Sequence, residues 1–393
     1  MKFGLLPRII LAIVLGILIG LVSPIPLIRG FATFNGLFGN FLGFIIPLLI
    51  IGFIVPGIGA IGQGAGKLLG WTAAIAYIST IVAGLLAFIT AKTLYPSILA
   101  NQSLKEFTNP EEALLKPYFH IEMDPLMGIM TALLLSFVIG IGIAAVKSDL
   151  LLNLSNDFRD IIHLVIEKVI IPLLPIHILG IFANMTHAGQ VGSILSIFIK
   201  VFAMIIVLHI AYLIIQYMIA GSVQKRNPFS MLKTMSPAYF TALGTQSSAA
   251  TIPVTLKQAK KIVKRERVAD FTIPLLATIH LSGSTITLVS CSMAVMFMLG
   301  QSYALMTMLP FILMLGITMV AAPGVPGGAV MAAIGLLESM LGFGPAMTAL
   351  MIALYITQDS FGTACNVTGD GAITAIMDKI SRGNSVEDSR KAI

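Results

Sequence analysis

Apolar segments long enough to cross a lipid bilayer recur along almost the whole of this chain of 393 residues. A helix needs about 20 mostly apolar residues to span the hydrocarbon core. Hydrophobic residues make up 57% of the chain and charged residues only 10%, against about 25% charged residues in soluble domains. So few charged side chains cannot cover a surface that faces water. The sequence therefore predicts an all-α polytopic membrane protein. The expected spans are residues 8–24, 39–58, 69–95, 126–146, 161–183, 193–222, 268–299 and 346–377.

Basic residues gather at alternate ends of these segments. They are Lys2, Arg8, Lys67, Lys147, Lys225, Arg226, Lys233 and a Lys/Arg cluster at 257–267. Because loops rich in Lys and Arg stay in the cytoplasm, both termini are predicted to be cytoplasmic in a bacterial-type inner membrane, with an external loop at 96–123. The basic run is therefore read as a topology anchor, and no nucleic-acid partner is expected. The polar tail 382–393 is expected to lie in the cytoplasm, with fraying from Ser381 onward.

Two further apolar stretches, about 229–256 and 303–342, are interrupted in their middles. The interruptions are the Ser-rich segment 245–253 and the Gly/Pro-rich segment 322–328. Backbone that is not helical at membrane depth must be covered by protein or line a watery cavity, which two re-entrant hairpins would satisfy. Each hairpin precedes a span with polar residues at mid-depth, and such an inverted repeat of broken helices is typical of transporters. Ordinary kinked helix pairs are the alternative.

Four polar residues form the strongest constellation. Asp359, Thr363, Asn366 and Asp370 are spaced i, i+4, i+7 and i+11, so they share one face of a helix. A carboxylate at membrane depth costs about 2.5–3.5 kcal/mol and calls for compensating partners. Carboxylate, amide and carbonyl oxygens suit a hard cation such as sodium. A buried hydrogen-bond network that only holds helices together is the alternative.

A second polar patch, Thr278 to Thr285, interrupts the span at 268–299. Gly283 within the patch is expected to let the helix unwind and expose carbonyl groups. His280 could relay a proton, since its unperturbed pKa is about 6.5, or donate hydrogen bonds as a neutral ring. The chain has no nucleotide-binding loop and no catalytic Ser/Lys, Ser/His or metalloprotease spacing, so an enzyme is not expected.

Three motifs carry a family resemblance: Gln246 to Val254, Gly324 to Gly327, and Asn366 to Asp370. In this order they resemble the dicarboxylate/amino acid:cation symporters, the glutamate transporter homologues, with local motifs similar to the serine/threonine–sodium branch. The resemblance implies eight transmembrane helices, two re-entrant hairpins and a homotrimer in the lipid membrane that works by an elevator mechanism. It also implies a trimerisation scaffold at 1–66 and 124–190 and a transport domain at 67–95 and 191–381.

The same resemblance assigns roles by motif position. It implies that Asp359 binds the substrate amino group and that the two hairpin tips and Asn366 bind the substrate carboxylate. The implied substrate residues are Ser247, Ser248, Ser284, Gly324, Val325, Pro326, Gly327, Asp359, Gly362, Thr363 and Asn366. The implied cation residues are Leu276, Thr278, His280, Ser282, Ala322, Asn366 and Asp370.

Two departures from the family pattern bear on the substrate and the coupling ion. Members that take acidic substrates carry an arginine three residues after the aspartate, where this chain has Gly362. Loss of a bidentate cation favours a small neutral amino acid, with an acidic amino acid or C4-dicarboxylate as the alternative and an ion channel on the same scaffold as the second. His280 and Ser282 replace the family's sodium-ligating Asn and Asp, which predicts fewer sodium ions per cycle, with or without a proton carried by His280.

Overall fold

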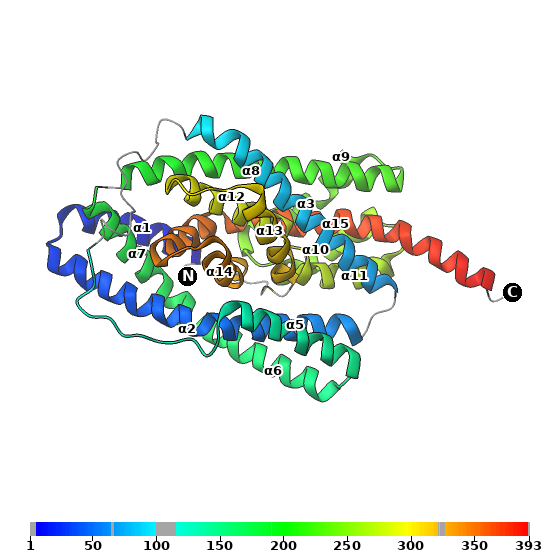
Figure 1. Cartoon of the computed structure of the whole chain (residues 1–393). Helices are drawn as coiled ribbons and strands as arrows, with labels where there is room; N and C mark the ends of the chain where they lie inside the picture. The colour runs from blue at the N-terminus through cyan, green and yellow to red at the C-terminus, as the bar shows by residue number, and fades with distance from the viewer. Residues whose placement is uncertain are drawn as a thin grey trace.

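The computed structural model describes residues 5–63, 67–99, 115–189, 191–320, 322 and 327–391, and every regular element among them is helical (Figure 1). The all-α prediction is therefore confirmed. The helices, in chain order, are α1 (Leu5–Val22), α2 (Ile25–Gln63), α3 (Lys67–Ile98), α5 (Ile129–Val146), α6 (Asp149–Val165), the π-helix η2 (Ile166–Ile170), α7 (Ile171–His187), α8 (Val191–Gln224), α9 (Pro228–Thr245), α10 (Ser248–Ile262), α11 (Glu266–Ile279), α12 (Ser282–Met298), α13 (Leu305–Val320), α14 (Gly328–Leu341) and α15 (Pro345–Lys391).

Each segment that was expected to span a membrane coincides with one to three of these helices. Within the described residues, five helical stretches are long and apolar enough to cross a bilayer, and α1, α5, α13 and α14 add shorter apolar helices. The five stretches are Ile25–Pro56, Leu68–Ile98, Asp149–His187, Ile197–Gln224 and Glu266–Met298. The protein is thus a multi-pass membrane protein by composition and helix length, whereas the number of crossings and their direction stay predictions.

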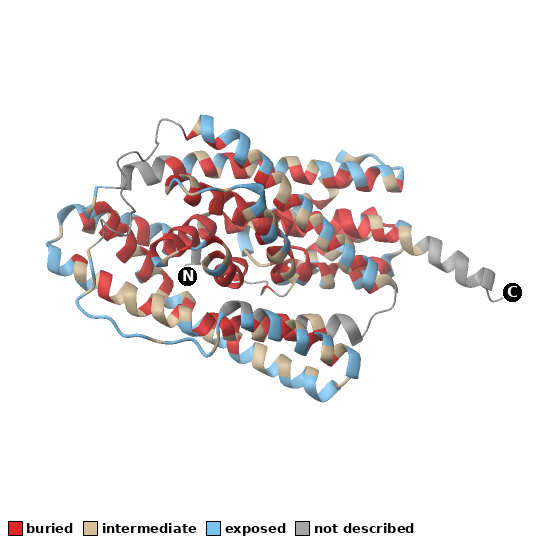
Figure 2. Cartoon of the chain, viewed as in Figure 1, coloured by how far each residue is buried: buried red, intermediate tan, exposed pale blue. Residues whose placement is uncertain are grey.

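The helices pack in two groups. α1 lies along α7, and α2 lies along α5, α6 and α7. The other group surrounds α12 and α15, against which α3, α8 and the helices α9 to α11 pack. Burial is deepest here: in an 18-residue apolar window of the α11–α12 span, 94% of the residues are buried (Figure 2). Because this span is shielded from lipid by its neighbours, it can carry polar groups that a lipid-facing helix could not.

The first interrupted stretch is a helical hairpin. Asn227 caps α9, since its Oδ1 accepts hydrogen bonds from the backbone N–H groups of Phe229 and Ser230 at 2.9 and 3.1 Å. α9 ends at Thr245, Gln246 takes a left-handed conformation (φ 54°), and Ser247 caps α10. The chain thus reverses within two residues, as the Ser-rich segment predicts.

The second interrupted stretch is also two helices, α13 and α14, which pack against each other. α14 begins after Gly327, whose φ of 74° is one that glycine adopts without steric cost. The tip residues Pro323, Gly324, Val325 and Pro326 lie outside the described residues.

Two expectations need correction. Gly283 does not unwind its helix: the break falls at His280 and Leu281, and Gly283 lies inside α12, where α15 approaches too closely for any side chain. The tail was expected to fray from Ser381, but α15 continues to Lys391. The reason is that Arg265 donates hydrogen bonds to the Ser381 hydroxyl and to the Asp378 carbonyl, which anchors the last turns of the apolar part of α15.

Residues 115–128, which include the end of the predicted external loop at 96–123, have no regular structure and lie against the first helical group, whereas residues 96–98 at the start of that loop continue α3. The Arg29 guanidinium stacks over the Tyr118 ring and donates to the Lys116 carbonyl. The Asn184 side chain pairs with both backbone groups of Leu115. Side chains of α2 and α7 therefore satisfy backbone groups that would otherwise need water.

Candidate functional site

The polar face of α15 meets each of the broken helices at a different residue. Asp359 is buried, and its Oδ2 accepts a hydrogen bond of 2.6 Å from the backbone N–H of Gly327, at the start of α14. The positive end of the α14 dipole thus faces a carboxylate, a favourable pairing at a helix N-terminus. This hydrogen bond links Asp359 to the second hairpin.

Asn366, one further turn along the same face, holds the N-terminus of α12. Its Oδ1 accepts from the backbone N–H groups of Gly283 and Ser284 at 2.7 and 3.2 Å, and its Nδ2 donates to the Ser284 hydroxyl at 2.9 Å. The amide NH₂ group has two donors, so one N–H is left after the bond to Ser284. The orientation of Asn366 is fixed by α12 in advance of any ligand.

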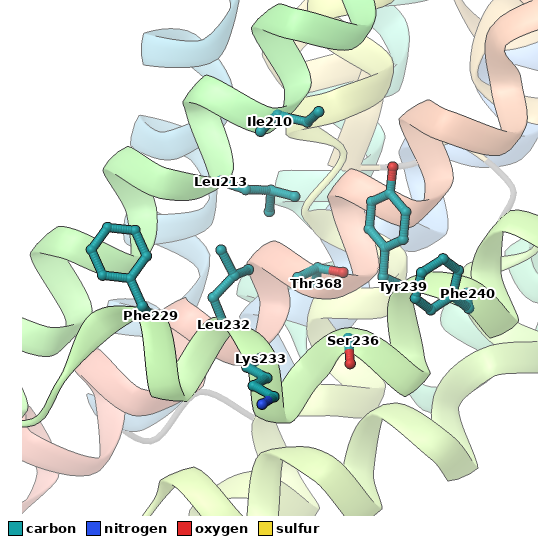
Figure 3. A pocket seen from close by; sticks show the side chains of 9 residues that line it. All are labelled: Ile210, Leu213, Phe229, Leu232, Lys233, Ser236, Tyr239, Phe240 and Thr368. Atoms are coloured by element: carbon teal, nitrogen blue, oxygen red, sulfur yellow. The ribbon is translucent and has the colours of Figure 1, made fainter.

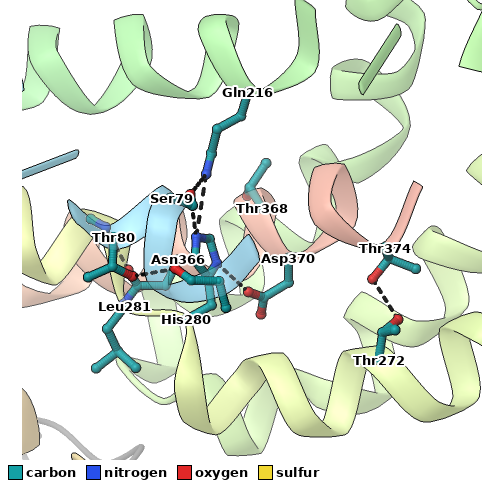
Figure 4. Close-up of polar contacts among 12 residues, drawn as sticks. Ser79, Thr80, Gln216, Thr272, His280, Leu281, Asn366, Thr368, Asp370 and Thr374 are labelled. Atoms are coloured by element: carbon teal, nitrogen blue, oxygen red, sulfur yellow. Dashed lines mark hydrogen bonds and ion pairs between the residues drawn. The ribbon is translucent and has the colours of Figure 1, made fainter. Parts of the chain in front are cut away.

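Asp370 meets the break between α11 and α12. His280 Nδ1 donates to Asp370 Oδ1 at 2.8 Å, and both side chains are buried (Figure 4). The other carboxylate oxygen, Oδ2, is buried without a hydrogen-bond partner among the described residues, and so is the Ser282 hydroxyl. Because buried polar atoms are nearly always satisfied, these two oxygens are candidate ligands for a hard cation.

The far side of the His280 ring faces a network that the sequence analysis missed. His280 Nε2 lies 3.0 Å from the Ser79 hydroxyl on α3, and Gln216 Nε2 on α8 donates to that hydroxyl at 3.0 Å. The Ser79 hydroxyl can donate to a neutral ring or accept from a charged one, so the network accommodates both states. The only signal in the sequence is a polar residue at the middle of each apolar span, at Ser79 and Gln216.

Gly283 allows α12 and α15 to touch. A Cβ at Gly283 would overlap the Gly362 carbonyl oxygen and lie 2.6 Å from Cys365 Cβ. The Gly283 carbonyl in turn accepts a 2.9 Å hydrogen bond from His209 Nε2 on α8. His209 therefore supports the turn that Asn366 caps.

Gly362 is a different case. A Cβ there would meet its nearest neighbours at 3.5 Å, which is ordinary van der Waals contact. Glycine is thus not required by packing at this atom. Packing at the Cβ position therefore does not explain why glycine stands three residues after Asp359.

The remaining predicted residues differ in their burial. Ser248, Thr363 and Ala322 are buried, and the Ser247 hydroxyl accepts from Ala250 N–H as the α10 cap. Thr278 is exposed, with its hydroxyl bonded to the Leu275 carbonyl, and the Leu276 carbonyl accepts the His280 N–H. The structure does not bring Thr278 into the buried cluster. Gly324, Val325 and Pro326 lie outside the described residues.

An apolar helical bundle in which one buried helix carries carboxylates to the breaks of other helices is typical of secondary transporters. The sequence pattern of the sodium:dicarboxylate symporter family matches residues 5–380, and the chain belongs to this family. The protein is therefore a cation-coupled symporter of amino acids or dicarboxylates rather than an enzyme, and the family implies sodium as the coupling ion.

Several curated proteins are similar over nearly their whole length. Serine/threonine transporters SstT from three strains of Acinetobacter baumannii are each 27% identical to this chain over 399 residues. Each alignment covers 98% of this chain and 98% of the relative. The predicted family resemblance is confirmed.

Proposed function

We propose that the protein is a sodium symporter for a small neutral amino acid, of the size of serine, threonine or alanine. The observation that carries this proposal is Gly362, because a glycine, which has no side chain, stands where members that take acidic substrates carry an arginine. Without a bidentate guanidinium, a second substrate carboxylate would be desolvated without a partner. The similarity to proteins named serine/threonine transporters supports the same substrate class.

In this proposal the amino acid lies between α15 and the two hairpin tips. Asp359 binds the substrate ammonium group, while the free N–H of Asn366 and the tip residues Ser247 and Ser248 bind the α-carboxylate. The N-termini of α10, α12 and α14 add favourable dipole ends for that carboxylate. Thr363 and Ser284 line the pocket, together with residues 324–327 of the second tip.

Sodium is proposed to bind beside the substrate, with Asp370 Oδ2 and the Ser282 hydroxyl as the first two donors. Carbonyl oxygens near Leu276 and Ala322, with Thr278 and Asn366, complete the set of candidate ligands. Because His280 holds the other oxygen of Asp370 at 2.8 Å, we expect fewer sodium ions per cycle than in members with an Asn and an Asp at these places. Coupling to a proton through His280 stays an open alternative within the proposal.

Movement is proposed to occur between the two helical groups. Residues 1–66 and 124–190 form a trimerisation scaffold in this scheme, and residues 67–95 and 191–381 form a transport domain that moves as an elevator in a homotrimer. The packing of α1, α2 and α5 to α7 with one another supports this division. The basic ends of the helices support cytoplasmic termini in an inner membrane.

A competition assay tests the substrate class. Proteoliposomes with an inward sodium gradient should take up serine, and unlabelled serine, threonine or alanine should compete while glutamate and succinate do not. Gly362→Arg should allow aspartate to compete with serine for uptake, because a Cβ at this position lies at ordinary contact distance from its neighbours. Strong competition by glutamate or succinate in the unaltered protein would contradict the proposal and favour an acidic substrate; sodium-independent, non-saturable flux would favour a channel.

The position of the site is tested with Asp359→Asn. Asparagine keeps an oxygen that can accept the Gly327 N–H but loses the charge that binds an ammonium group, so uptake should fall by at least tenfold while the protein stays folded. Sodium-dependent thermal shift in detergent reports folding independently of uptake. Asp160→Asn, at an exposed carboxylate on α6, is the matched control and should transport normally. Unchanged uptake by Asp359→Asn would place the site elsewhere.

A further inference from the structure

A groove of about 330 Å³ lies between α8, α9 and α15. Its walls are apolar and include Leu213 from α8 and Phe229, Leu232 and Phe240 from α9 (Figure 3). Phe229 and Phe240 are 62% and 66% exposed, so the rim of the groove also presents large apolar surface. The groove therefore has the shape and the surface to accept an apolar chain.

One polar group in this groove has no partner. Thr368 lines the groove from α15, is only 1% exposed, and its hydroxyl makes no hydrogen bond. Several buried helical threonines donate to the carbonyl four residues earlier, as Thr272 does to Val268 and Thr285 to Leu281, whereas among the described residues the buried hydroxyl of Thr348 on α15 is unpartnered like that of Thr368. Because an unsatisfied buried hydroxyl is costly, the hydroxyl of Thr368 indicates that the groove holds a ligand with an acceptor oxygen.

A cation lies beside the same groove. Lys233 lines it from the second turn of α9 and is exposed, and none of the carboxylates in the described residues lies within 4.0 Å of its ammonium group. It belongs to the basic end of the molecule, with Lys225 and Arg226 just before α9. A basic end of this kind meets the membrane–water boundary, where anionic lipid headgroups gather.

A second apolar groove shows that this combination is not general. It has a volume of about 600 Å³ and lies between α3 and α8, with Lys200 among its lining residues. The Lys200 ammonium group, however, donates to the Ile98 carbonyl at 2.8 Å, so its charge is already used to cap the end of α3. The groove between α8, α9 and α15 differs because neither the Lys233 ammonium group nor the Thr368 hydroxyl has a partner among the described residues.

We propose that the groove between α8, α9 and α15 binds an anionic phospholipid, with the phosphate at Lys233 and one acyl chain along the apolar walls. The Thr368 hydroxyl donates to an oxygen of the lipid near its headgroup. Thr368 lies two residues from both Asn366 and Asp370 on α15, and α9 is half of the first hairpin. A lipid in this groove therefore contacts both the helix that carries the polar stripe and the hairpin that closes over it.

Lipid binding can be measured without any transport assay. Purified protein in neutral detergent is mixed with phosphatidylglycerol or phosphatidylcholine, and bound lipid is counted by native mass spectrometry. The unaltered protein should retain phosphatidylglycerol in preference to phosphatidylcholine. Lys233→Gln should weaken phosphatidylglycerol binding about fivefold, the effect of one basic residue at a membrane surface, and Ser236→Phe should abolish binding by filling the groove.

The matched control is Lys257→Gln, which removes the same charge from an exposed position on α10 that does not line the groove. It should bind phosphatidylglycerol normally. Lys233→Arg is a second control: it keeps the positive charge and should also bind phosphatidylglycerol normally. Equal weakening by both Gln variants would overturn the proposal in favour of a diffuse basic surface. An unchanged lipid count in Ser236→Phe would overturn it as well.

Photo-crosslinking identifies the occupant directly. A photoreactive phosphatidylglycerol in vesicles of phosphatidylcholine should label α9 peptides in the unaltered protein and not in Ser236→Phe. A photoreactive amino acid at Ser236 should capture lipid; capture of α1 or α2, or of a second copy of the chain, would show that protein covers the groove and would overturn the proposal. None of these readouts requires amino acid substrate, so they are independent of the proposed function.

Discussion

Gly283 and Gly362 differ in whether packing requires a glycine, and this difference can be measured. Alanine at Gly283 would place a methyl group against the Gly362 carbonyl and 2.6 Å from Cys365 Cβ, so α12 and α15 would have to separate. We expect Gly283→Ala to destabilise the protein by about 1–3 kcal/mol, the usual cost of overpacking. Gly362→Ala should be neutral or stabilising by about 0.5–1 kcal/mol, because a helical alanine orders more readily than glycine.

Thermal unfolding of the two variants in detergent, without ligand, checks this prediction. Both substitutions add one methyl group, and they lie on facing helices of the same buried interface. A melting temperature that falls equally in both would mean that the helix contact is not set by Gly283. The spacing of the sequence alone suggested an unwound Gly283, because a glycine among polar residues has the same pattern whether it breaks a helix or lets two helices touch.

The stripe on α15 shows what could and could not be predicted at this scale. Its shared face follows from helical spacing, which involves only neighbouring residues. Its partners on other helices, Gly327, Ser284 and His280, are set by how three separate helices pack, which no local pattern records. For the same reason Ser79 and Gln216 went unnoticed, since a single polar residue in an apolar span has many possible roles.

At the scale of elements, a buried carboxylate ties the first hairpin to α11 and to the end of α15. Asp378 accepts hydrogen bonds from the backbone N–H groups of Lys264 and Arg265 and from the Gln224 side chain, at 3.0–3.2 Å. The Arg265 guanidinium also pairs with it at 3.2 Å. One side chain thus satisfies donors from α8 and from the turn between α10 and α11, which the basic cluster at 257–267 did not predict.

We expect Asp378→Ala to lower the stability of this junction by about 2–3 kcal/mol, because the charged Arg265 guanidinium and three neutral N–H donors would lose their common acceptor. Asp270→Ala is the control: its ion pair with Lys260 at 2.7 Å is about half exposed and should contribute at most about 1 kcal/mol. Hydrogen exchange should become faster at residues 263–267 in Asp378→Ala only. Similar exchange in both variants would show that the buried carboxylate is not the tie.

The helices themselves were predictable because membrane insertion demands long apolar runs, and interruptions by Ser, Gly and Pro marked the hairpins. Their lengths were not. α2, for example, extends from Ile25 to Gln63, whereas the apolar criterion gave 39–58. The added residues 25–38 include Arg29 and Asn35, which interrupt the apolar run in the sequence, but a helix continues past such residues as long as its backbone hydrogen bonds and its neighbours support it.

At the scale of the whole molecule, the number of ions moved per amino acid sets how steeply the transporter can concentrate its substrate. Each net charge that crosses a potential of 100 mV supplies about 2.3 kcal/mol. A cation site with one fewer anionic ligand should bind one fewer sodium ion, and this chain has Ser282 and His280 where the family has Asp and Asn. We therefore predict a lower sodium stoichiometry than in members that keep both residues.

Reversal potentials in proteoliposomes measure this number, since the potential at which net flux stops depends on the sodium and amino acid gradients in proportion to their coupling. Parallel gradients of pH reveal any proton carried through His280. Ser282→Asp should raise the number of coupled sodium ions, because the buried, unpartnered hydroxyl at that place would become a carboxylate with affinity for a hard cation. A stoichiometry already equal to that of the members with Asp and Asn, and unchanged by Ser282→Asp, would mean that the cation is held by other oxygens of α15 and the helix breaks.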